Sequence, residues 1–421
     1  MELAIKGGEP LRKSPWGSWP IWNNKSDKYL SEVIQSKRWS IRGSWTGVEP
    51  KEVAVASAFS QYNKCSYCTL TTSGTMGLSI ALEALNISDK DEVIVPALTW
   101  IAPITAILNV GAIPVMVDVE KETTCLSPES IKQSITPRTK AIIVIHLHCS
   151  VANMDEILKI SKENNLYVIE DCSQAHGAMW EENYVGTMGD IGVFSLNQEK
   201  VLTCGEGGAI ITNNSELFER IVRTKTDGCD FDESKQIIEE DQLIYDNKLM
   251  GSNYCISEFQ SAVLLGQLEK LEEWNAIRRD NANYLDKRLS KIKGMHPLTS
   301  HGKATQRTYY EYGVLIDLAY FAGKDLGTIL NAVSAEINIP IHSTDVPVYK
   351  NDLFTPWTKK KYKHYVESKE FLSLDSKKFP VCEYLHNHLA VFHHRYLMGS
   401  HDDMNDIANA FEKVQACIKE L

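Results

Sequence analysis

Short runs of β-branched and other apolar residues recur along the first half of the chain, and each is followed by a segment of helical character. The runs contain few polar positions, which is typical of strands buried on both faces of a parallel sheet. Four such strands are predicted, at residues 91–96, 113–118, 140–145 and 166–169. Helices are predicted around them at residues 75–85, 101–109, 128–135 and 154–164. Crossover helices that join parallel strands produce this alternation, so the pattern predicts an α/β domain.

The second half of the chain has a less regular pattern. Further elements are predicted as a helix at 213–228, a long helix at 257–292 that bridges two domains, a strand at 309–316, and helices at 327–333 and 404–418. Residues 229–249 are acidic and show no clear period, so we expect an exposed loop there. The whole pattern predicts three parts: an N-terminal arm (1–50), a large mostly parallel α/β domain (51–280) and a smaller C-terminal α+β domain (281–421).

Composition narrows the class of protein. The chain has 421 residues, of which 43% are hydrophobic and 24% charged, as in ordinary folded domains. Its formal net charge of -11 argues against nucleic acid as a partner, because a phosphodiester backbone rewards Lys/Arg patches. No stretch approaches the roughly 20 apolar residues of a membrane span. The start of the chain lacks an apolar leader and the ten cysteines are scattered, so we expect reduced thiols and a cytoplasmic location.

An aspartate, a hydroxyl and a lysine follow the predicted strands in an informative order. Asp171 ends an apolar run, and Ser195 and Lys200 stand five residues apart before the glycine-rich turn 205–208. A lysine amine can form a Schiff base with the aldehyde of pyridoxal 5'-phosphate (PLP), and a carboxylate can keep its pyridine nitrogen protonated. Taken alone, Asp171 would be interpreted as a helix cap or a surface acid, and Lys200 as a solvated surface lysine. Their joint occurrence in this order favours a PLP site.

Two further segments add to this interpretation. Residues 71–75 open a predicted helix, whose N–H groups and hydroxyls can receive a phosphate, although alone they would be a common helix cap. Trp100 lies just past a strand end, where open α/β sheets bind ligands, and its ring can stack on a pyridine; core packing is the alternative. Cys65 and Cys68 form a lone C-x-x-C without a second pair, so no metal site is predicted.

Together these motifs resemble the DegT/DnrJ/EryC1/StrS family of sugar aminotransferases, which are fold-type I PLP enzymes. The resemblance runs from about residue 39 to the end of the chain. It is carried by Thr72–Thr75, Glu92–Trp100, His146–His148, Ile169–Gly177, Gly189–Ser195, Lys200 and Gly205–Gly208.

The resemblance implies a role for individual residues. Lys200 is implied to be the Schiff-base lysine and catalytic acid and base, and Asp171 the partner of the pyridinium nitrogen. The other cofactor-binding residues implied are Gly74, Thr75 and Ser195 at the phosphate, Gln174 at the ring hydroxyl, Trp100 stacked on the ring, and Asn253 from the neighbouring subunit of a homodimer.

Within the family, four stretches resemble the L-glutamine:scyllo-inosose and 2-deoxy-scyllo-inosose aminotransferases. They are Arg38–Ile41, Ser44–Gly47, Gly251–Ser261 and Asn351–Lys359. This likeness implies ping-pong transfer of an amino group from L-glutamine or L-glutamate to a keto-cyclitol or ketosugar, in aminoglycoside or other secondary-metabolite biosynthesis. Two positions depart from many relatives: Cys149 stands in place of a glycine, and Cys255 in place of an arginine.

Three other interpretations of the function stay open. They are a nucleotide-ketosugar aminotransferase, an enzyme like 3-amino-5-hydroxybenzoate synthase, and a PLP-binding regulator without turnover. Relatives that dehydrate deoxysugars have histidine in place of Lys200, so its presence favours transamination. Several aromatic residues are candidates for the acceptor pocket, with core or interface packing as the alternative: Trp16, Trp19, Trp22, Trp45, Tyr309, Tyr310 and Tyr312. The pair His393–His394 resembles one in the cyclitol enzymes and has no assigned role.

Overall fold

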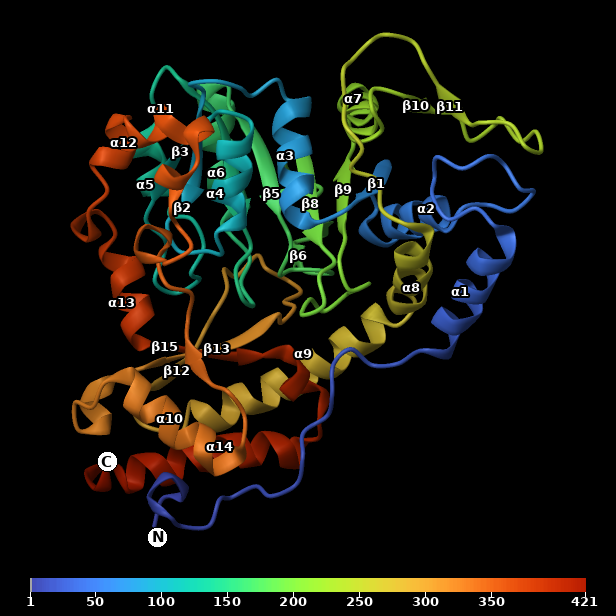
Figure 1. Ribbon diagram of the computed structural model, residues 1–421. Helices are drawn as coiled ribbons and strands as arrows, with labels where there is room; N and C mark the ends of the chain where they lie inside the picture. Colours follow the sequence, from blue (N-terminus) through green and yellow to red (C-terminus); the bar gives the residue numbers. More distant parts are fainter. Residues whose placement is uncertain (1) are drawn as a thin grey trace.

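The computed structural model describes residues 2–421, and its largest element is a seven-stranded sheet (Figure 1). In spatial order the strands are β1 (Tyr67–Thr71), β9 (Gly208–Thr212), β8 (Ile191–Ser195), β5 (Tyr167–Asp171), β4 (Thr139–Ile145), β2 (Glu92–Pro96) and β3 (Ile113–Val117). Only β9 runs against its neighbours in this sheet. The prediction of a mostly parallel sheet is confirmed.

Helices cover both faces of this sheet. They are α3 (Gly74–Ala84), α4 (Ala102–Asn109), α5 (Pro128–Ser134), α6 (Met154–Asn164) and α7 (Ser215–Lys225). Successive side chains of a strand point to opposite faces. Val93 and Val95 of β2 accordingly pack into one apolar core, while Ile94 packs into the other. The continuous apolar runs of the sequence therefore mark strands with two buried faces, as predicted.

A smaller antiparallel sheet lies below the first in Figure 1. Its order is β12 (Met295–Pro297), β13 (Glu311–Ile316), β15 (Leu389–His393) and β14 (His342–Ser343). The helices of this part are α9 (Leu271–Leu289), α10 (Leu326–Ile337), α13 (Pro380–His388) and α14 (His401–Ala416). The strand predicted at 309–316 and the helices predicted at 327–333 and 404–418 are confirmed. The predicted boundary after residue 280 lies inside α9, and the division into three parts stays a prediction.

Short elements make the remaining connections. They are η1 (Ala4–Lys6), β6 (Met179–Trp180), β7 (Asn183–Tyr184), η2 (Leu318–Phe321), η3 (Val348–Lys350), η4 (Pro356–Thr358), η5 (Lys360–Tyr362), α11 (Lys363–Val366), α12 (Lys369–Leu372), η6 (Ser376–Lys378), η7 (His394–Met398) and η8 (Ile418–Glu420). Within residues 2–421, no helix combines the length and apolar character that a bilayer crossing requires.

The single long helix predicted at 257–292 is wrong, because the chain forms two helices there. A capping box between Ser257 and Gln260 starts α8 (Glu258–Leu268), which ends before Lys270, and α9 begins at Leu271. The two helices pack on different partners. Helix α8 contacts α1 (Asn24–Ser36) and α2 (Lys51–Asn63), whereas α9 contacts α14. The apolar period continues across the break and so conceals it.

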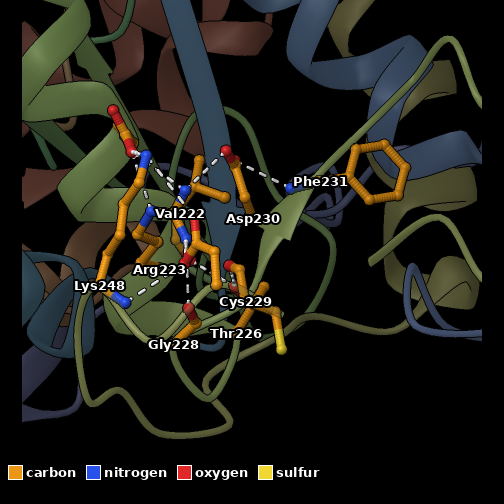
Figure 2. Close-up of polar contacts among 10 residues, drawn as sticks. Val222, Arg223, Thr226, Gly228, Cys229, Asp230, Phe231 and Lys248 are labelled. Atoms are coloured by element: carbon orange, nitrogen blue, oxygen red, sulfur yellow. Dashed lines mark hydrogen bonds and ion pairs between the residues drawn. The ribbon is translucent and has the colours of Figure 1, made fainter. Parts of the chain in front are cut away.

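The segment expected to be an exposed loop carries a short hairpin, β10 (Asp230–Phe231) with β11 (Leu243–Ile244), that projects beyond the large sheet (Figure 1). Figure 2 shows its anchor, the buried guanidinium of Arg223. Arg223 donates to Asp246 at 2.5 Å through Nη1 and to Asp230 at 2.9 Å through Nη2. The base of the hairpin is therefore fixed to α7, while its tip is exposed.

Candidate active site

A cavity of about 420 Å³ opens where the large sheet faces the segments around β13 and β14. It lies at the carboxyl ends of β1, β2, β5 and β8, which is where open α/β sheets bind ligands. Seven of the predicted site residues line it: Gly74, Thr75, Trp100, Asp171, Gln174, Ser195 and Lys200. The eighth, Asn253, does not. Residues more than 100 positions apart in the sequence thus meet in one chamber.

Lys200 and Asp171 carry the titratable chemistry of the sheet side. Burial lowers the pKa of the Lys200 amine, and the carboxylate of Asp171 opposes that shift. Burial also raises the pKa of Asp171, whose Oδ1 accepts a hydrogen bond from the Ser173 N–H at 3.0 Å. Within residues 2–421, neither Asp171 nor Lys200 forms an ion pair, and both line the cavity. Both groups therefore remain available to a ligand.

One end of the cavity is suited to an anion. Helix α3 starts there, with the Ser73 side chain capping the N–H of Met76 at 3.1 Å. The N–H groups of the first helical turn have no intrahelical partners and carry a partial positive charge. A Cβ on Gly74 would lie 2.8 Å from the Ser195 Cβ, so only glycine permits this close approach. The backbone of Gly74 and the hydroxyls of Thr75 and Ser195 thus surround one small space.

Gln174 and Trp100 lie along the same cavity. The amide oxygen of Gln174 accepts from the His148 N–H at 2.6 Å, which leaves the amide NH₂ as its available donor. Trp100 is 53% exposed and lines the cavity, so its ring is not part of the core. The alternative of core packing is therefore wrong for this tryptophan.

The opposite side of the cavity is acidic. Tyr310, Glu311 and Asp345 line it, and the Lys200 Nζ lies 4.0 Å from the centroid of the Tyr310 ring. Glu311 Oε2 lies 2.8 Å from His148 Nδ1. Burial alone would raise the pKa of Glu311, but the hydrogen bond with His148 and the nearby charges, Lys200 among them, together outweigh burial, so the pKa is lowered.

Asp345 differs from Glu311 because it has no hydrogen bond or ion pair within residues 2–421. Burial and the neighbouring Glu311 raise its pKa. Among the residues that line the cavity, Lys200 is the only lysine or arginine, against five carboxylates: Asp171, Glu199, Glu206, Glu311 and Asp345. Sequence reasoning missed Glu311 and Asp345, since neither lies in a motif.

Asn253 is exposed and forms an isolated bridge with Thr226, close to the base of the projecting hairpin. The two departures from the family pattern also lie outside the cavity. Cys149 accepts a hydrogen bond from Arg307 at 3.1 Å, and the Cys255 thiol lies 3.5 Å from the Lys225 carbonyl. Neither thiol faces the chamber of its own chain.

One group of side chains within residues 2–421 has the spacing of a metal site: His146, Glu170 and Cys172. The oxygens of Glu170 already accept from His146 and from the N–H groups of Gly186, Met188 and Gly189 at 2.6–3.2 Å. The carboxylate is therefore used to hold the backbone behind Asp171.

Of the aromatic residues suggested for an acceptor pocket, only Tyr310 lines the cavity. Trp45, Tyr309 and Tyr312 are buried in the interior, and Trp22 is 73% exposed. Trp16 and Trp19 are partly buried; Trp16 donates to the Ile337 carbonyl, and Trp19 to the carbonyls of Gln198 and Lys200. Core packing is thus correct for three of the seven.

Comparison with known proteins identifies the family. The model of the DegT/DnrJ/EryC1/StrS aminotransferase family matches residues 26–374. The chain belongs to this family. It is therefore an aminotransferase, and its cofactor is PLP.

Curated relatives cover nearly the whole of this family member. The L-glutamine:2-deoxy-scyllo-inosose aminotransferase of Streptoalloteichus tenebrarius is 39% identical over 414 residues, 98% of this chain and 97% of that protein. The enzyme of the same name from Micromonospora echinospora is 40% identical over 420 residues, 100% and 99% of the two chains. The L-glutamine:scyllo-inosose aminotransferase of Streptomyces griseus is 37% identical over 421 residues, 100% and 99%.

Solved structures agree with the fold. The 3-amino-5-hydroxybenzoic acid synthase structure matches with a TM-score of 0.81 at 25% identity, covering 96% of this chain and 100% of that one. An aminotransferase from Psychrobacter cryohalolentis matches with a TM-score of 0.82 at 27% identity, with the same coverage. The fold-type I aminotransferase architecture predicted from the sequence is confirmed.

The cavity fits PLP on three observations. The approach of Gly74 to Ser195 shapes a space for an anion at a helix N-terminus. Asp171 offers a buried carboxylate that forms no ion pair and lines the cavity from the end of β5. Lys200 offers a buried amine whose pKa is lowered by that burial. A phosphate, a pyridinium nitrogen and an aldehyde are the groups these three features suit.

Proposed function

We propose that this aminotransferase moves the amino group of L-glutamine or L-glutamate to the ketone of a polyhydroxylated carbocycle, a keto-cyclitol. The observation that carries the proposal is the cavity itself. A lysine without an ion pair and a buried carboxylate share it with an acidic wall that suits neutral, hydroxyl-rich rings. The names and full-length similarity of the cyclitol aminotransferases support this choice of donor and acceptor.

The cofactor-binding residues are proposed as the sequence predicted them. When bound, PLP supplies an aldehyde that takes up nitrogen and a ring that delocalises the electrons of the donor Cα–H bond. Asp171 accepts a hydrogen bond from the protonated ring nitrogen, and Gln174 donates to the ring hydroxyl. The remaining contacts are stacking by Trp100 and phosphate binding by Gly74, Thr75 and Ser195.

Lys200 is the proposed catalytic acid and base. A buried amine is more easily neutral than an exposed one, because burial disfavours the ammonium. The Nζ would then move the proton between the donor Cα and the carbon that carries the aldehyde of PLP. Its place above the Tyr310 ring holds the amine inside the chamber.

The acidic wall decides between acceptors. Glu311 and Asp345 can accept hydrogen bonds from ring hydroxyls, which are strong when the acceptor is charged. The same two carboxylates repel a phosphate group. This favours a keto-cyclitol over a nucleotide-linked ketosugar.

The proposed active form is a homodimer in the cytoplasm, serving aminoglycoside or other secondary-metabolite biosynthesis. The exposed position of Asn253 supports the dimer, because this residue is proposed to reach the phosphate in the partner's cavity. Exposed apolar side chains on and beside the nearby hairpin also support it: Ile237, Ile238, Tyr245 and Met250. The three-part domain division predicted from the sequence is retained within this proposal.

Product analysis tests the function. The PLP-loaded protein is incubated with L-glutamine and one acceptor at a time: a keto-cyclitol, its phosphorylated form or a nucleotide-linked ketosugar. The amines formed are identified by mass spectrometry. We expect amination of the keto-cyclitol. Amination of the nucleotide-linked sugar alone would overturn the acceptor, and formation of an aromatic amine would indicate a 3-amino-5-hydroxybenzoate synthase-like reaction. No amine from any of the three acceptors would favour the PLP-binding regulator.

A further inference from the structure

The backbone around Lys200 accepts hydrogen bonds from side chains that are distant in the sequence. The Trp19 indole N–H lies 3.2 Å from the carbonyl oxygens of both Gln198 and Lys200. These carbonyls belong to a segment between β8 and β9 that has turns but no helix or strand. The segment therefore depends on such contacts for its conformation.

The histidine pair contacts the carbonyl between those two. Nε2 of His393 lies 2.9 Å from the Glu199 carbonyl oxygen, and Nε2 of His394 lies 3.0 Å from the same atom. A carbonyl only accepts, so both Nε2 atoms carry the hydrogen. Nδ1 of His393 accepts from the Arg395 N–H at 3.3 Å, which requires the same tautomer. Two imidazoles of defined tautomer thus converge on one carbonyl.

The same histidines also contact Tyr310, whose ring lies beside the Lys200 amine. The N–H of His394 donates to the Tyr310 carbonyl at 3.1 Å. The Tyr310 ring lies 6.0 Å from the His393 ring and 6.3 Å from the His394 ring, and the Lys200 Nζ lies 4.0 Å from its centroid. The contacts of His393 and His394 therefore hold both the backbone beside Lys200 and the Tyr310 ring, against which the Lys200 side chain ends.

Trp19 is itself held in place. Its ring meets His394 edge-on at 4.7 Å and Trp274 at 5.6 Å, and the guanidinium of the fully buried Arg278 lies 4.8 Å from its centroid. Such contacts stabilise a ring in a defined orientation. Since Trp19 lies in residues 1–50, this part of the chain contacts the segment that carries Lys200.

We propose that Trp19, His393 and His394 are positioning residues that hold the backbone of residues 198–200 and so keep the Lys200 amine above the Tyr310 ring. The inference rests on the proposed role of Lys200 in catalysis. None of the three side chains lines the cavity, so they act through Lys200. A lysine side chain has four rotatable bonds, so a fixed backbone and a fixed resting surface narrow its positions.

The test uses Trp19→Phe, which removes the indole N–H and keeps an aromatic ring. The matched control is Trp22→Phe, because Trp22 donates to Asp27 at 3.2 Å and has no contact with residues 198–200. In cofactor-free full-length protein, isotopic labelling of lysine amines across a pH series gives the protonation midpoint of Lys200 from its peptide mass. The loaded enzyme then gives kcat and KM for L-glutamine.

A loosened backbone admits water to the amine, so we expect the Lys200 midpoint of Trp19→Phe to rise by roughly half a pH unit or more. We expect kcat to fall about tenfold with KM for L-glutamine unchanged. Trp22→Phe should match the wild type in all three values. A Trp19→Phe protein with a lower Tm but an unchanged midpoint and kcat would overturn the proposal, since the contacts would then be structural only.

A second pair of variants separates hydrogen bonding from packing. His393→Leu removes the donor to Glu199, whereas His393→Gln offers an amide N–H in its place, so only the leucine variant should shift the midpoint and kcat. His393 is partly exposed, which makes both replacements tolerable to the fold. Equal behaviour of the two variants would contradict the role of the hydrogen bond. The labelling midpoint is measured without turnover, so it tests the inference even if no acceptor is aminated.

Discussion

The two walls of the cavity are built differently. The sheet wall consists of single residues placed at or just after strand ends, each with a group suited to one part of PLP, such as the carboxylate of Asp171. The facing wall brings together Tyr310, Glu311 and Asp345 from irregular segments and strand starts, and its charge is negative. The difference suggests that one wall fixes the chemistry and the other selects the acceptor.

The largest effect is expected on the sheet wall, from Lys200→Ala. Loss of the amine removes the group proposed to move the proton, so turnover should fall by about 1000-fold or more. The fold should persist, because Lys200 forms no ion pair within residues 2–421. Amine production is measured beside Tm, with Lys303→Ala, an exposed lysine, as the control. A fully active Lys200→Ala protein would refute the mechanism.

A smaller but clear loss is expected from Asp171→Asn, which keeps the size of the side chain and removes its charge. An amide cannot keep the ring nitrogen protonated, so kcat should fall about 100-fold while KM for the acceptor changes little. Steady-state kinetics for both substrates provide the measurement. A rise in acceptor KM with normal kcat would place Asp171 among the acceptor contacts and erase the distinction between the walls.

Asp345→Asn tests the facing wall. We expect kcat/KM for the keto-cyclitol to fall about tenfold, because a neutral amide accepts a weaker hydrogen bond than a carboxylate. The half-reaction with L-glutamine should remain normal, and a phosphorylated acceptor should be tolerated better than by the wild type. An equal loss in both half-reactions would show that Asp345 does not discriminate between substrates.

The smallest effect concerns stability. Removing the charge of Glu311 and removing that of Asp345 should change the free energy of unfolding in opposite directions. The pKa of Glu311 is lowered in the folded state, so its contribution is present above its ordinary value of 4.5 and is lost as pH falls below it. Glu311→Gln should therefore lower the free energy of unfolding by about 1 kcal/mol at neutral pH, and by less in acid. Urea unfolding at several pH values measures this.

Asp345→Asn is the matched comparison in that experiment. Burial raises the pKa of Asp345, so its ionised form is less favourable in the folded state than in the unfolded state. The asparagine variant should be as stable as the wild type or more stable. A loss of stability equal to that of Glu311→Gln would mean that Asp345 has a stabilising partner in the protein.

The sheet wall could be predicted from the sequence because its signals are local. Asp171 closes an apolar run, and Lys200 stands at a fixed spacing from Ser195 before a glycine-rich turn. Glu311 and Asp345 carry no such signal, because a single acid in an irregular stretch has no period, and only tertiary packing brings it to the cavity. The break between α8 and α9 was hidden for a related reason: the helices change partners while the apolar period continues.

The most direct test follows the cofactor of the wild-type protein through both half-reactions in one cuvette. We expect a visible absorption band with bound PLP, its loss on addition of L-glutamine, and its return when an unphosphorylated keto-cyclitol is added after the donor is removed. A band that L-glutamine and L-glutamate leave unchanged, or one that returns only with a nucleotide-linked ketosugar, would contradict this expectation.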